Sequence, residues 1–453
     1  MSKVIFAPTA LLPDGWAEQV VIECDDSGNV TRVEKNAKMP AGALSVDGPV
    51  LPGMPNLHSH AFQRAMAGLA EVALNPEDSF WTWRDLMYRL VGKLTPDQVE
   101  DIARYLYIEM LKGGYTAVAE FHYLHHDLDG RRYADPAEMS RRVLSAAERA
   151  GIGITLLPVL YAHGGFGGKP PADGQKRFIS SVDDYLKMQE SLAKDCAVPG
   201  RRLGFCFHSL RAVTRDQIHA VIASIHDDRP VHIHIAEQQK EVDDCLAWSN
   251  RRPIQWLYDN AHVDQRWCLI HATHAEADEV AAMAASQAVV GLCPTTEANL
   301  GDGLFPAVDF INAGGRIGVG SDSHVSLSVV EELRWLEYGQ RLKHERRNRL
   351  HDASRHVAGF LYRANATGGA QALGQKMGAI AVGNRADLVV LDGHHPLLAA
   401  IKGDDILGRW LFAGFNRMVK DVMVGGDWVV QDGRHGDEIE AGRAFTAVVR
   451  AAV

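Results

Sequence analysis

Pro55-Asn56-Leu57-His58-Ser59-His60 ends the apolar run that starts at Val50. Side chains alternate along a strand with a period of two, so His58 and His60 should project from the same face. Two imidazoles side by side at the end of a strand are a ready pair of ligands for a borderline metal such as zinc. The pair alone is a weak signal, because the chain contains 21 histidines. Its weight depends on partners at the ends of other predicted strands.

From about residue 50 to 370 the chain alternates apolar strands with amphipathic helices, a pattern that predicts parallel β/α units. One helix start is specific: Thr95-Pro96-Asp97-Gln98 places a threonine at the N-cap, proline at the first helical position and glutamine at the third. An α/β fold follows, a (β/α)₈ TIM-type barrel with an elaborated segment after strand 1. The eight predicted strands are 50–56, 115–123, 152–161, 202–208, 230–236, 267–272, 288–293 and 316–321.

The two ends of the chain share a different, strand-rich pattern. Residues 19–24 and 30–33 flank the hairpin-type turn Asp25–Asn29, and residues 419–430 form a second predicted hairpin. We expect the ends to pair in one small β-sandwich domain that is discontinuous in sequence. The predicted division is residues 1–50 with 372–453 for this domain, and residues 51–371 for a metal-dependent catalytic barrel.

Composition and charge narrow the class of protein. The 453 residues are 46% hydrophobic and 23% charged, which is ordinary for a globular protein. A formal charge of −10 argues against a nucleic-acid partner, and no apolar run approaches the ~18 to 20 residues of a membrane span. The six cysteines lack C-x-x-C spacing, so we interpret them as reduced. Without a signal peptide at the N-terminus, the prediction is a cytoplasmic enzyme for a small molecule, with no nucleic-acid or membrane partner, and a homodimer.

The chemistry of a (β/α)₈ barrel lies at the carboxyl ends of its strands, and those positions are rich in metal ligands here. His58, His60, His234 and Asp322 form an N₃O set for one divalent metal, with Zn²⁺ preferred and Fe²⁺ as the alternative. Such a metal lowers the pKa of a bound water from ~15.7 toward ~7. His271 and Asp322 would then receive the proton of that water, and Glu237 would pass a proton to a leaving nitrogen.

Other histidines have less specific interpretations. His232 shares the face of His234 one layer deeper, so we interpret it as a hydrogen-bonded core residue. His122, His125 and His126 are interpreted as a solvated loop, with a functional role as the alternative. His324 is either near the site or merely local.

H-x-H on strand 1, H-x-x-E on strand 5, histidine on strand 6 and S-D on strand 8 resemble the amidohydrolase superfamily, in particular its mononuclear aminohydrolase branch. Binuclear members carry a metal-bridging lysine at the end of strand 4. The corresponding stretch here is Phe207-His208-Ser209-Leu210-Arg211, which has no lysine. The resemblance therefore implies one metal per chain.

Three stretches are similar to formimidoylglutamate deiminases: residues 56–64, Phe80-Trp81-Thr82-Trp83-Arg84, and residues 293–303, which read CPTTEANLGDG. The resemblance implies hydrolysis of N-formimino-L-glutamate to N-formyl-L-glutamate and ammonia, in histidine degradation. It also implies a substrate pocket formed by Gln63, Arg84, Tyr123, His208 and Arg211.

Arg84 and Arg211 would suit a substrate with two carboxylates, because guanidinium groups bind carboxylates through bidentate forks. Their alternative is pairing with protein carboxylates such as Asp85 or Asp216. Two other functions stay open: deamination of a nucleobase-like or related ring by another member of the superfamily, and a non-enzymatic scaffold. The scaffold is disfavoured because no predicted ligand is missing.

Overall fold

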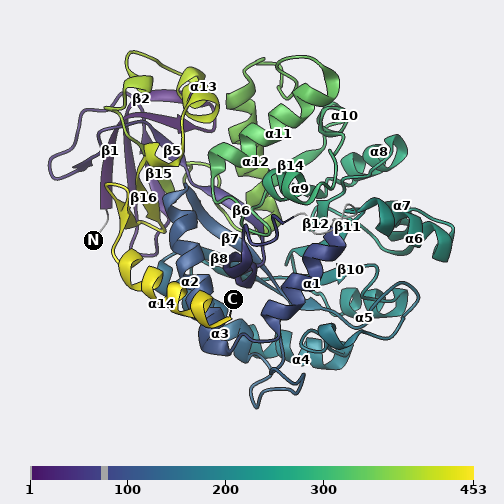
Figure 1. Cartoon of the computed structure of the whole chain (residues 1–453). Helices are drawn as coiled ribbons and strands as arrows, with labels where there is room; N and C mark the ends of the chain where they lie inside the picture. Colours follow the sequence, from purple (N-terminus) through teal and green to yellow (C-terminus); the bar gives the residue numbers. More distant parts are fainter. Residues whose placement is uncertain (1–2, 73–79, 453) are drawn as a thin grey trace.

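The computed structural model describes residues 3–72 and 80–452, and its centre is a parallel barrel with helices around it (Figure 1). Each barrel strand is buried on both faces where a helix covers its outer side. The predicted (β/α)₈ barrel is confirmed. In spatial order its strands are β6 (Met54–Ser59), β7 (Tyr115–His122), β8 (Gly153–Leu160), β10 (Phe205–Ser209), β11 (Val231–Ile235), β12 (Trp267–His271), β13 (Val289–Leu292) and β14 (Arg316–Val319), with β9 (Arg201–Leu203) beside β8.

The barrel closes between β6 and the segment after β14, through the backbone of predicted metal ligands. The His60 N–H donates to the Asp322 carbonyl at 3.2 Å, and the Asp322 N–H donates to the His58 carbonyl at 3.0 Å. Gly320 permits this close approach, because a Cβ at that position would lie 2.7 Å from the His58 Cβ. Closure of the fold and assembly of the site therefore depend on the same contacts.

Helices surround the barrel, and the predicted Thr95 cap is present. The Thr95 hydroxyl accepts from the Gln98 N–H, while the Gln98 side chain accepts from the Thr95 N–H at 3.0 Å. The helices are α1 (Phe80–Val91), α2 (Pro96–Lys112), α3 (Glu138–Ala150), α4 (Val182–Leu192), α5 (Arg215–Ala223), α6 (Gln239–Ser249), α7 (Pro253–Asn260), α8 (Ala277–Ser286), α9 (Pro294–Leu300), α10 (Ala307–Asn312), α11 (Val329–His344) and α12 (Val357–Leu373), with 3₁₀ turns η1 (Ala61–Met66) and η2 (Asp173–Gln175).

Strands from both chain ends form one separate nine-stranded sheet, which confirms the prediction that the two ends pair (Figure 1). It contains β1 (Lys3–Leu12), β2 (Gly15–Cys24), β3 (Val30–Glu34), β4 (Leu44–Ser45), β5 (Val50–Pro52), β15 (Leu388–Leu391), β16 (Val419–Val424), β17 (Asp427–Gln431) and β18 (Arg434–His435). The join between the chain ends is the antiparallel pair of β5 and β15. Alternate residues of β1, β2, β5 and β15 enclose a second hydrophobic core.

The first predicted strand, 50–56, is wrong in one respect. Residues 50–52 belong to the sheet of the chain ends, and the barrel strand begins at Met54. Gly53 joins the two segments where the chain passes closest to β7, since a Cβ there would lie 2.2 Å from the Thr116 hydroxyl oxygen. An uninterrupted apolar run conceals this change of sheet, because both segments are buried.

The C-terminal region also contains helices that we did not predict: α13 (Asp404–Ala413) and α14 (Glu438–Ala452), with 3₁₀ turns η3 (Pro396–Leu398) and η4 (Asn416–Met418). Helix α14 returns to the barrel and packs on α2, where buried Arg104 donates to Asp437 at 2.7 Å and to Glu440 at 2.8 Å.

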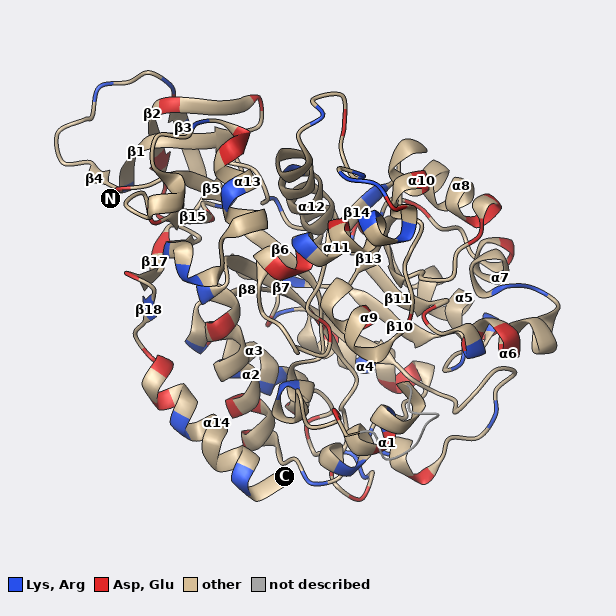
Figure 2. Cartoon of the chain, turned by 45° about the horizontal axis from the view of Figure 1, so that its top comes forward, with Lys and Arg blue, Asp and Glu red and all other residues tan. Residues whose placement is uncertain are grey.

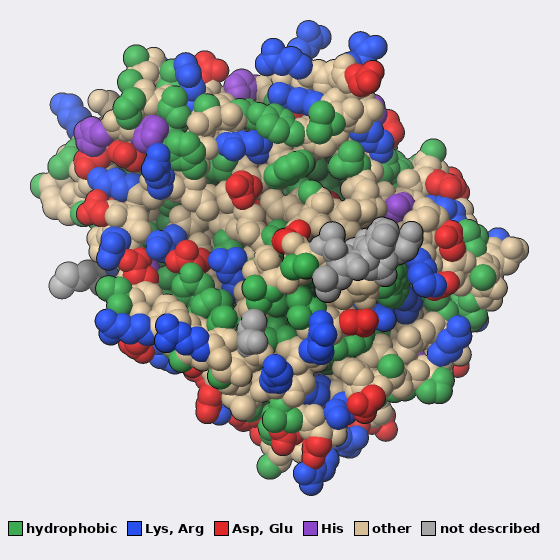
Figure 3. Space-filling model, viewed as in Figure 1, with side chains coloured by type: hydrophobic (Ala, Val, Ile, Leu, Met, Phe, Trp, Pro, Cys, Tyr) green, Lys and Arg blue, Asp and Glu red, His purple; other side chains and the backbone are tan. Residues whose placement is uncertain are grey.

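Acidic and basic residues are interspersed along the ribbons (Figure 2), and both signs occur on the face seen in Figure 3. Within residues 3–72 and 80–452, no helix is long and apolar enough to span a bilayer.

Candidate active site

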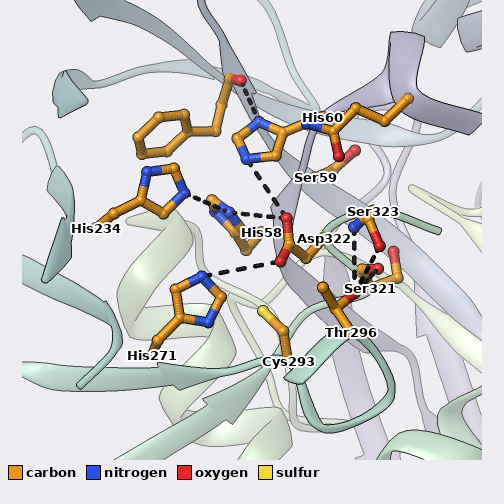
Figure 4. Close-up of polar contacts among 12 residues, drawn as sticks. His58, Ser59, His60, His234, His271, Cys293, Thr296, Ser321, Asp322 and Ser323 are labelled. Carbon is orange, nitrogen blue, oxygen red and sulfur yellow. Dashed lines mark hydrogen bonds and ion pairs between the residues drawn. The ribbon is translucent and has the colours of Figure 1, made fainter. Parts of the chain in front are cut away.

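Four predicted metal ligands converge at the closing seam of the barrel (Figure 4). The Nε2 atoms of His58 and His234 are 3.0 Å apart. Asp322 Oδ1 lies 3.5 Å from His58 Nε2 and 3.4 Å from His60 Nε2. All four side chains are buried. The structure thus brings one carboxylate oxygen and three imidazole nitrogens to a common centre.

Hydrogen bonds behind two of these rings, those of His60 and His234, set their tautomers. His60 Nδ1 contacts the Phe121 carbonyl at 2.9 Å, and His234 Nδ1 contacts the His208 carbonyl at 3.0 Å. A carbonyl oxygen only accepts, so each Nδ1 carries the hydrogen and each Nε2 presents a lone pair to the centre. This is the usual arrangement behind metal-binding histidines.

Burial keeps the three histidines neutral. Burial, followed by the charge of His60, lowers the pKa of His58 to about 3. Burial likewise lowers the pKa of His60, and that of His234 falls well below its usual value. Metal ligands must be deprotonated to bind. Three neutral imidazoles and a carboxylate therefore fit a divalent cation.

Two of the strand-end residues have strained backbones. His271 has φ 70° and Asp322 has φ 46°, both in the left-handed region that non-glycine residues seldom occupy. Such conformations cost of order 1–3 kcal/mol each and persist where surrounding structure enforces them. At these two positions the strain accompanies side chains that face the same cluster.

Glu237 and His271, the predicted acid–base residues, lie beside this cluster. His271 Nε2 lies 3.8 Å from Glu237 Oε1 and 3.8 Å from Asp322 Oδ2. Burial raises the pKa of Glu237 to about 7. Burial alone would lower the pKa of His271, but Glu237, Glu297 and Asp322 outweigh it and raise that pKa to about 10. A cation bound beside the ring would oppose this rise, because it repels an imidazolium.

A cavity of ≈ 560 Å³ opens over the cluster. All five residues that the resemblance implies for the substrate pocket line it, together with His60, His234, Glu237, His271 and Asp322: Gln63, Arg84, Tyr123, His208 and Arg211. Gln63 donates to the Tyr123 hydroxyl at 3.0 Å. Phe80 and Trp83 also line it and belong to the stretch Phe80–Arg84 quoted above. Four further lining residues escaped sequence reasoning because they look like ordinary core: Met87, Tyr88, Tyr161 and Phe178.

The two arginines are half-buried beside an indole. The Cζ atoms of Arg84 and Arg211 lie 4.7 Å and 5.5 Å from the centre of the Trp81 ring. Among the described residues, neither guanidinium has a carboxylate oxygen within the 4.0 Å of an ion pair, so pairing with Asp85 or Asp216 is wrong. Against the opposing effect of burial, the more distant carboxylates of Glu241 and Glu237 still act on Arg211 and raise its pKa.

The remaining histidines divide between core and support. His232 is buried with Nε2 2.8 Å from the Ala372 carbonyl, which confirms a core role. The interpretation of His122, His125 and His126 as a solvated loop is wrong, because all three are buried. His324 lies behind the H-x-H pair, with Nε2 3.2 Å from the Ser59 hydroxyl.

Two buried carboxylates that the sequence analysis did not assign support the site. Glu120 accepts from the Ser59 hydroxyl at 2.6 Å, the Ala61 N–H at 2.7 Å and the Tyr107 hydroxyl at 3.0 Å. These bonds hold the turn that follows the H-x-H pair. Glu297, in the stretch CPTTEANLGDG, contacts His271. A glutamate inside a buried strand was the available signal for Glu120.

The chain belongs to the amidohydrolase family, whose model matches residues 50–429. It is 65% identical over 448 residues to formimidoylglutamate deiminase of Pseudomonas aeruginosa, covering 99% of both chains. It is also 28% identical over 420 residues to 5-methylthioadenosine/S-adenosylhomocysteine deaminase of Natronomonas pharaonis, covering 91% of this chain and 88% of that protein. A crystal structure of an amidohydrolase from Brucella melitensis superposes with a TM-score of 0.93 at 46% identity, covering 99% of each chain.

Proposed function

We propose that this chain hydrolyses N-formimino-L-glutamate to N-formyl-L-glutamate and ammonia, a step in histidine degradation. Identity of 65% to a formimidoylglutamate deiminase across 99% of both chains supports this reaction. The structural observation that supports the reaction is a single cavity with two kinds of group in it. Two arginines there have no carboxylate partner among the described residues, and a cluster of neutral histidines lies beside Asp322. That combination suits a dicarboxylate with a hydrolysable head.

We further propose one divalent metal per chain, held by His58, His60, His234 and Asp322, with Zn²⁺ preferred and Fe²⁺ as the alternative. The buried N₃O donor set and the lone pairs that face its centre support this assignment. When bound, such a metal supplies Lewis acidity and a more acidic water at neutral pH.

The acid–base residues then move the proton of the attacking water. Water adds to the formimino carbon, and His271 with Asp322 receives the proton that this water gives up. That proton passes to Glu237, whose Oε1 lies 3.8 Å from His271 Nε2, and Glu237 delivers it to the departing nitrogen as the carbon–nitrogen bond breaks and ammonia leaves. A formamidine group arrives largely as a cation, so ionised Glu237 would also attract it before transfer.

The glutamate tail occupies the arginine side of the cavity in this proposal. Arg84 and Arg211 each bind one carboxylate of the substrate through a bidentate fork. Gln63, Tyr123 and His208 supply neutral donors and acceptors between the tail and the reacting head. Trp81 lies against both guanidiniums and holds them where a dicarboxylate can reach them.

The runner-up is a deaminase for a nucleobase-like or related ring, the class of the Natronomonas pharaonis relative. Arginines with no carboxylate partner among the described residues disfavour it, because a neutral flat ring would leave two cations unpaired. Ammonia release from formiminoglutamate, guanine and cytosine, assayed side by side, distinguishes the two. Ring deamination without turnover of formiminoglutamate would favour the runner-up.

Three assignments stay predictions. The division into residues 1–50 with 372–453 and residues 51–371 is supported by the separate core of the terminal sheet. The homodimer and the cytoplasmic location rest on the sequence analysis, and size-exclusion chromatography with light scattering would test the first.

A further inference from the structure

Helix α9 (Pro294–Leu300) lies within the stretch CPTTEANLGDG. One of its residues, Glu297, contacts His271 but has no role in the proposed mechanism. Glu297 is 7% exposed, and its Oε1 lies 3.2 Å from His271 Nδ1. The same oxygen accepts from the Cys293 N–H at 2.8 Å. One carboxylate oxygen of Glu297 therefore contacts both the backbone at the start of α9 and the Nδ1 side of the His271 ring, opposite Nε2.

These contacts fix which nitrogen of His271 carries hydrogen. An ionised carboxylate only accepts, so His271 Nδ1 must donate to Glu297. Nε2 is then the nitrogen 3.8 Å from both Glu237 Oε1 and Asp322 Oδ2, where protons move in the proposed reaction. With the opposite tautomer, Nε2 could not accept a proton.

We propose that Glu297 is a positioning residue, which holds His271 as the Nδ1–H tautomer and so keeps the lone pair of Nε2 on the side of Glu237 and Asp322. This inference rests on the proposed function for the role of His271 in proton transfer. It gives the glutamate of Thr295-Thr296-Glu297 a purpose in catalysis, because Glu297 contacts His271 and does not line the cavity over the site.

A competing interpretation is a second metal site, because ligand atoms of His271, Cys293 and Glu297 lie within 4.8 Å of one another. The direct contact of His271 Nδ1 with Glu297 Oε1 disfavours it, since that nitrogen is already engaged. The buried Cys293 thiol also has a pKa well above its usual value, chiefly because of burial, so it is poorly suited as a ligand.

Two substitutions separate charge from orientation. In Glu297→Gln the amide oxygen should stay beside the Cys293 N–H and still face His271 Nδ1, so the variant removes charge alone. Glu297→Met has similar length but removes the acceptor as well. The matched control is Glu332→Gln, because Glu332 is also buried and accepts from the Thr295 N–H of α9 at 3.0 Å. Among the described residues it has no contact with His271.

The expected result for Glu297→Gln is a ~10- to 100-fold lower kcat, as for residues that support a ligand or base from behind. KM for formiminoglutamate and the metal content should stay within about twofold of the parent. For Glu297→Met the loss should approach the ~10² to 10⁴ of a missing acid–base group. Glu332→Gln should keep the parent kcat.

A second readout does not depend on activity. In ¹⁵N-histidine-labelled protein, with His271→Asn used to assign the signal, His271 should appear as the Nδ1–H form in the parent and in Glu297→Gln. In Glu297→Met the Nε2–H form should become populated. The proposal would be overturned by an unchanged kcat in both Glu297 variants or by an unchanged tautomer in Glu297→Met. It would also be overturned if the parent bound a second metal that the Glu297 variants had lost. An inactive parent would refute the proposed function instead, while the tautomer measurement would still test Glu297.

Discussion

Replacing Arg84 or Arg211 by methionine tests the substrate assignment most directly. Each change keeps the apolar stem and removes a guanidinium that the structure holds beside Trp81, with no carboxylate ion pair among the described residues. If a dicarboxylate is the missing partner, either variant leaves one substrate carboxylate without its cation. If the substrate is a neutral ring, removal of a guanidinium that has no carboxylate partner in residues 3–72 and 80–452 should be harmless.

The size of the effect follows from burial. Truncating one member of a buried charge pair costs ~2 to 5 kcal/mol, and each ~1.4 kcal/mol is tenfold, so kcat/KM should fall by roughly 30-fold to several thousand-fold. Both arginines are half-buried, which favours the lower part of this range. Metal content should not change, because neither side chain belongs to the ligand cluster.

The two variants should differ in their pH dependence. Arg211 lowers the pKa of Glu237 against the larger, raising effect of burial, and the other charges that act most strongly on Glu237 are those of His271, Asp322 and Glu241. Arg211→Met should therefore raise the pKa of Glu237 and move the acidic limb of the kcat/KM profile to higher pH. Arg84→Met should lower the whole profile without moving that limb.

Steady-state assays of ammonia release between pH 5 and 9 would measure both effects. Arg89→Met is the matched control, since Arg89 lies on the same helix α1 but is exposed and outside the cavity. Its kcat/KM should equal that of the parent. Normal kcat/KM for formiminoglutamate in both cavity variants would refute the dicarboxylate site.

Three further predictions concern the rest of the site. Glu237→Gln should lower kcat by ~10² to 10⁴ with unchanged metal content, and turnover within a few-fold of the parent would remove Glu237 from proton transfer. Elemental analysis should find about one divalent metal per chain, reduced in His234→Asn, whereas two tightly bound metals or full activity without metal would contradict the ligand set. Burial raises the pKa of Glu120 from 4.5 to about 7, so the folded state holds a proton that the unfolded state has released in this range. Its stabilising contribution is complete below pH 4.5 and lost as pH rises through 7, roughly 3 kcal/mol in all, and the thermal midpoint of Glu120→Gln should vary less with pH than that of the parent.

The barrel was predictable because its strands are apolar on both faces and its helices carry local signals. The Thr95 cap and the alternation of segments follow from hydrogen bonding and burial near in sequence. The change of sheet at Gly53 was not predictable in the same way, since residues on both sides are buried. Helix α14 escaped notice because its packing on α2 depends on Arg104, more than 300 residues away.

The convergence of the predicted ligands was predictable because strand ends of a barrel meet at one rim, so residue type and position sufficed to bring His58, His234 and Asp322 together. Supporting contacts follow a different logic. Glu297, in the first turn of α9, reaches His271 at the end of β12 only in the folded chain, and no spacing in the sequence encodes that distance. Likewise, the absence of a carboxylate partner for Arg84 within the described chain is a property of packing.

The charges around His271 explain why the ligand cluster and the acid–base residues belong together. Asp322, Glu237 and Glu297 all act on this ring, and each raises its pKa against the cost of burial. Three carboxylates around one imidazolium leave an excess of negative charge in a buried region, which is costly without a further cation. Arg211 acts on Glu237 from the cavity side, but it forms no ion pair there within the described residues. A divalent cation at the centre of His58, His60, His234 and Asp322 would offset that excess and free His271 to act as a base, so the same charge that prepares the site for metal also prepares it for proton transfer.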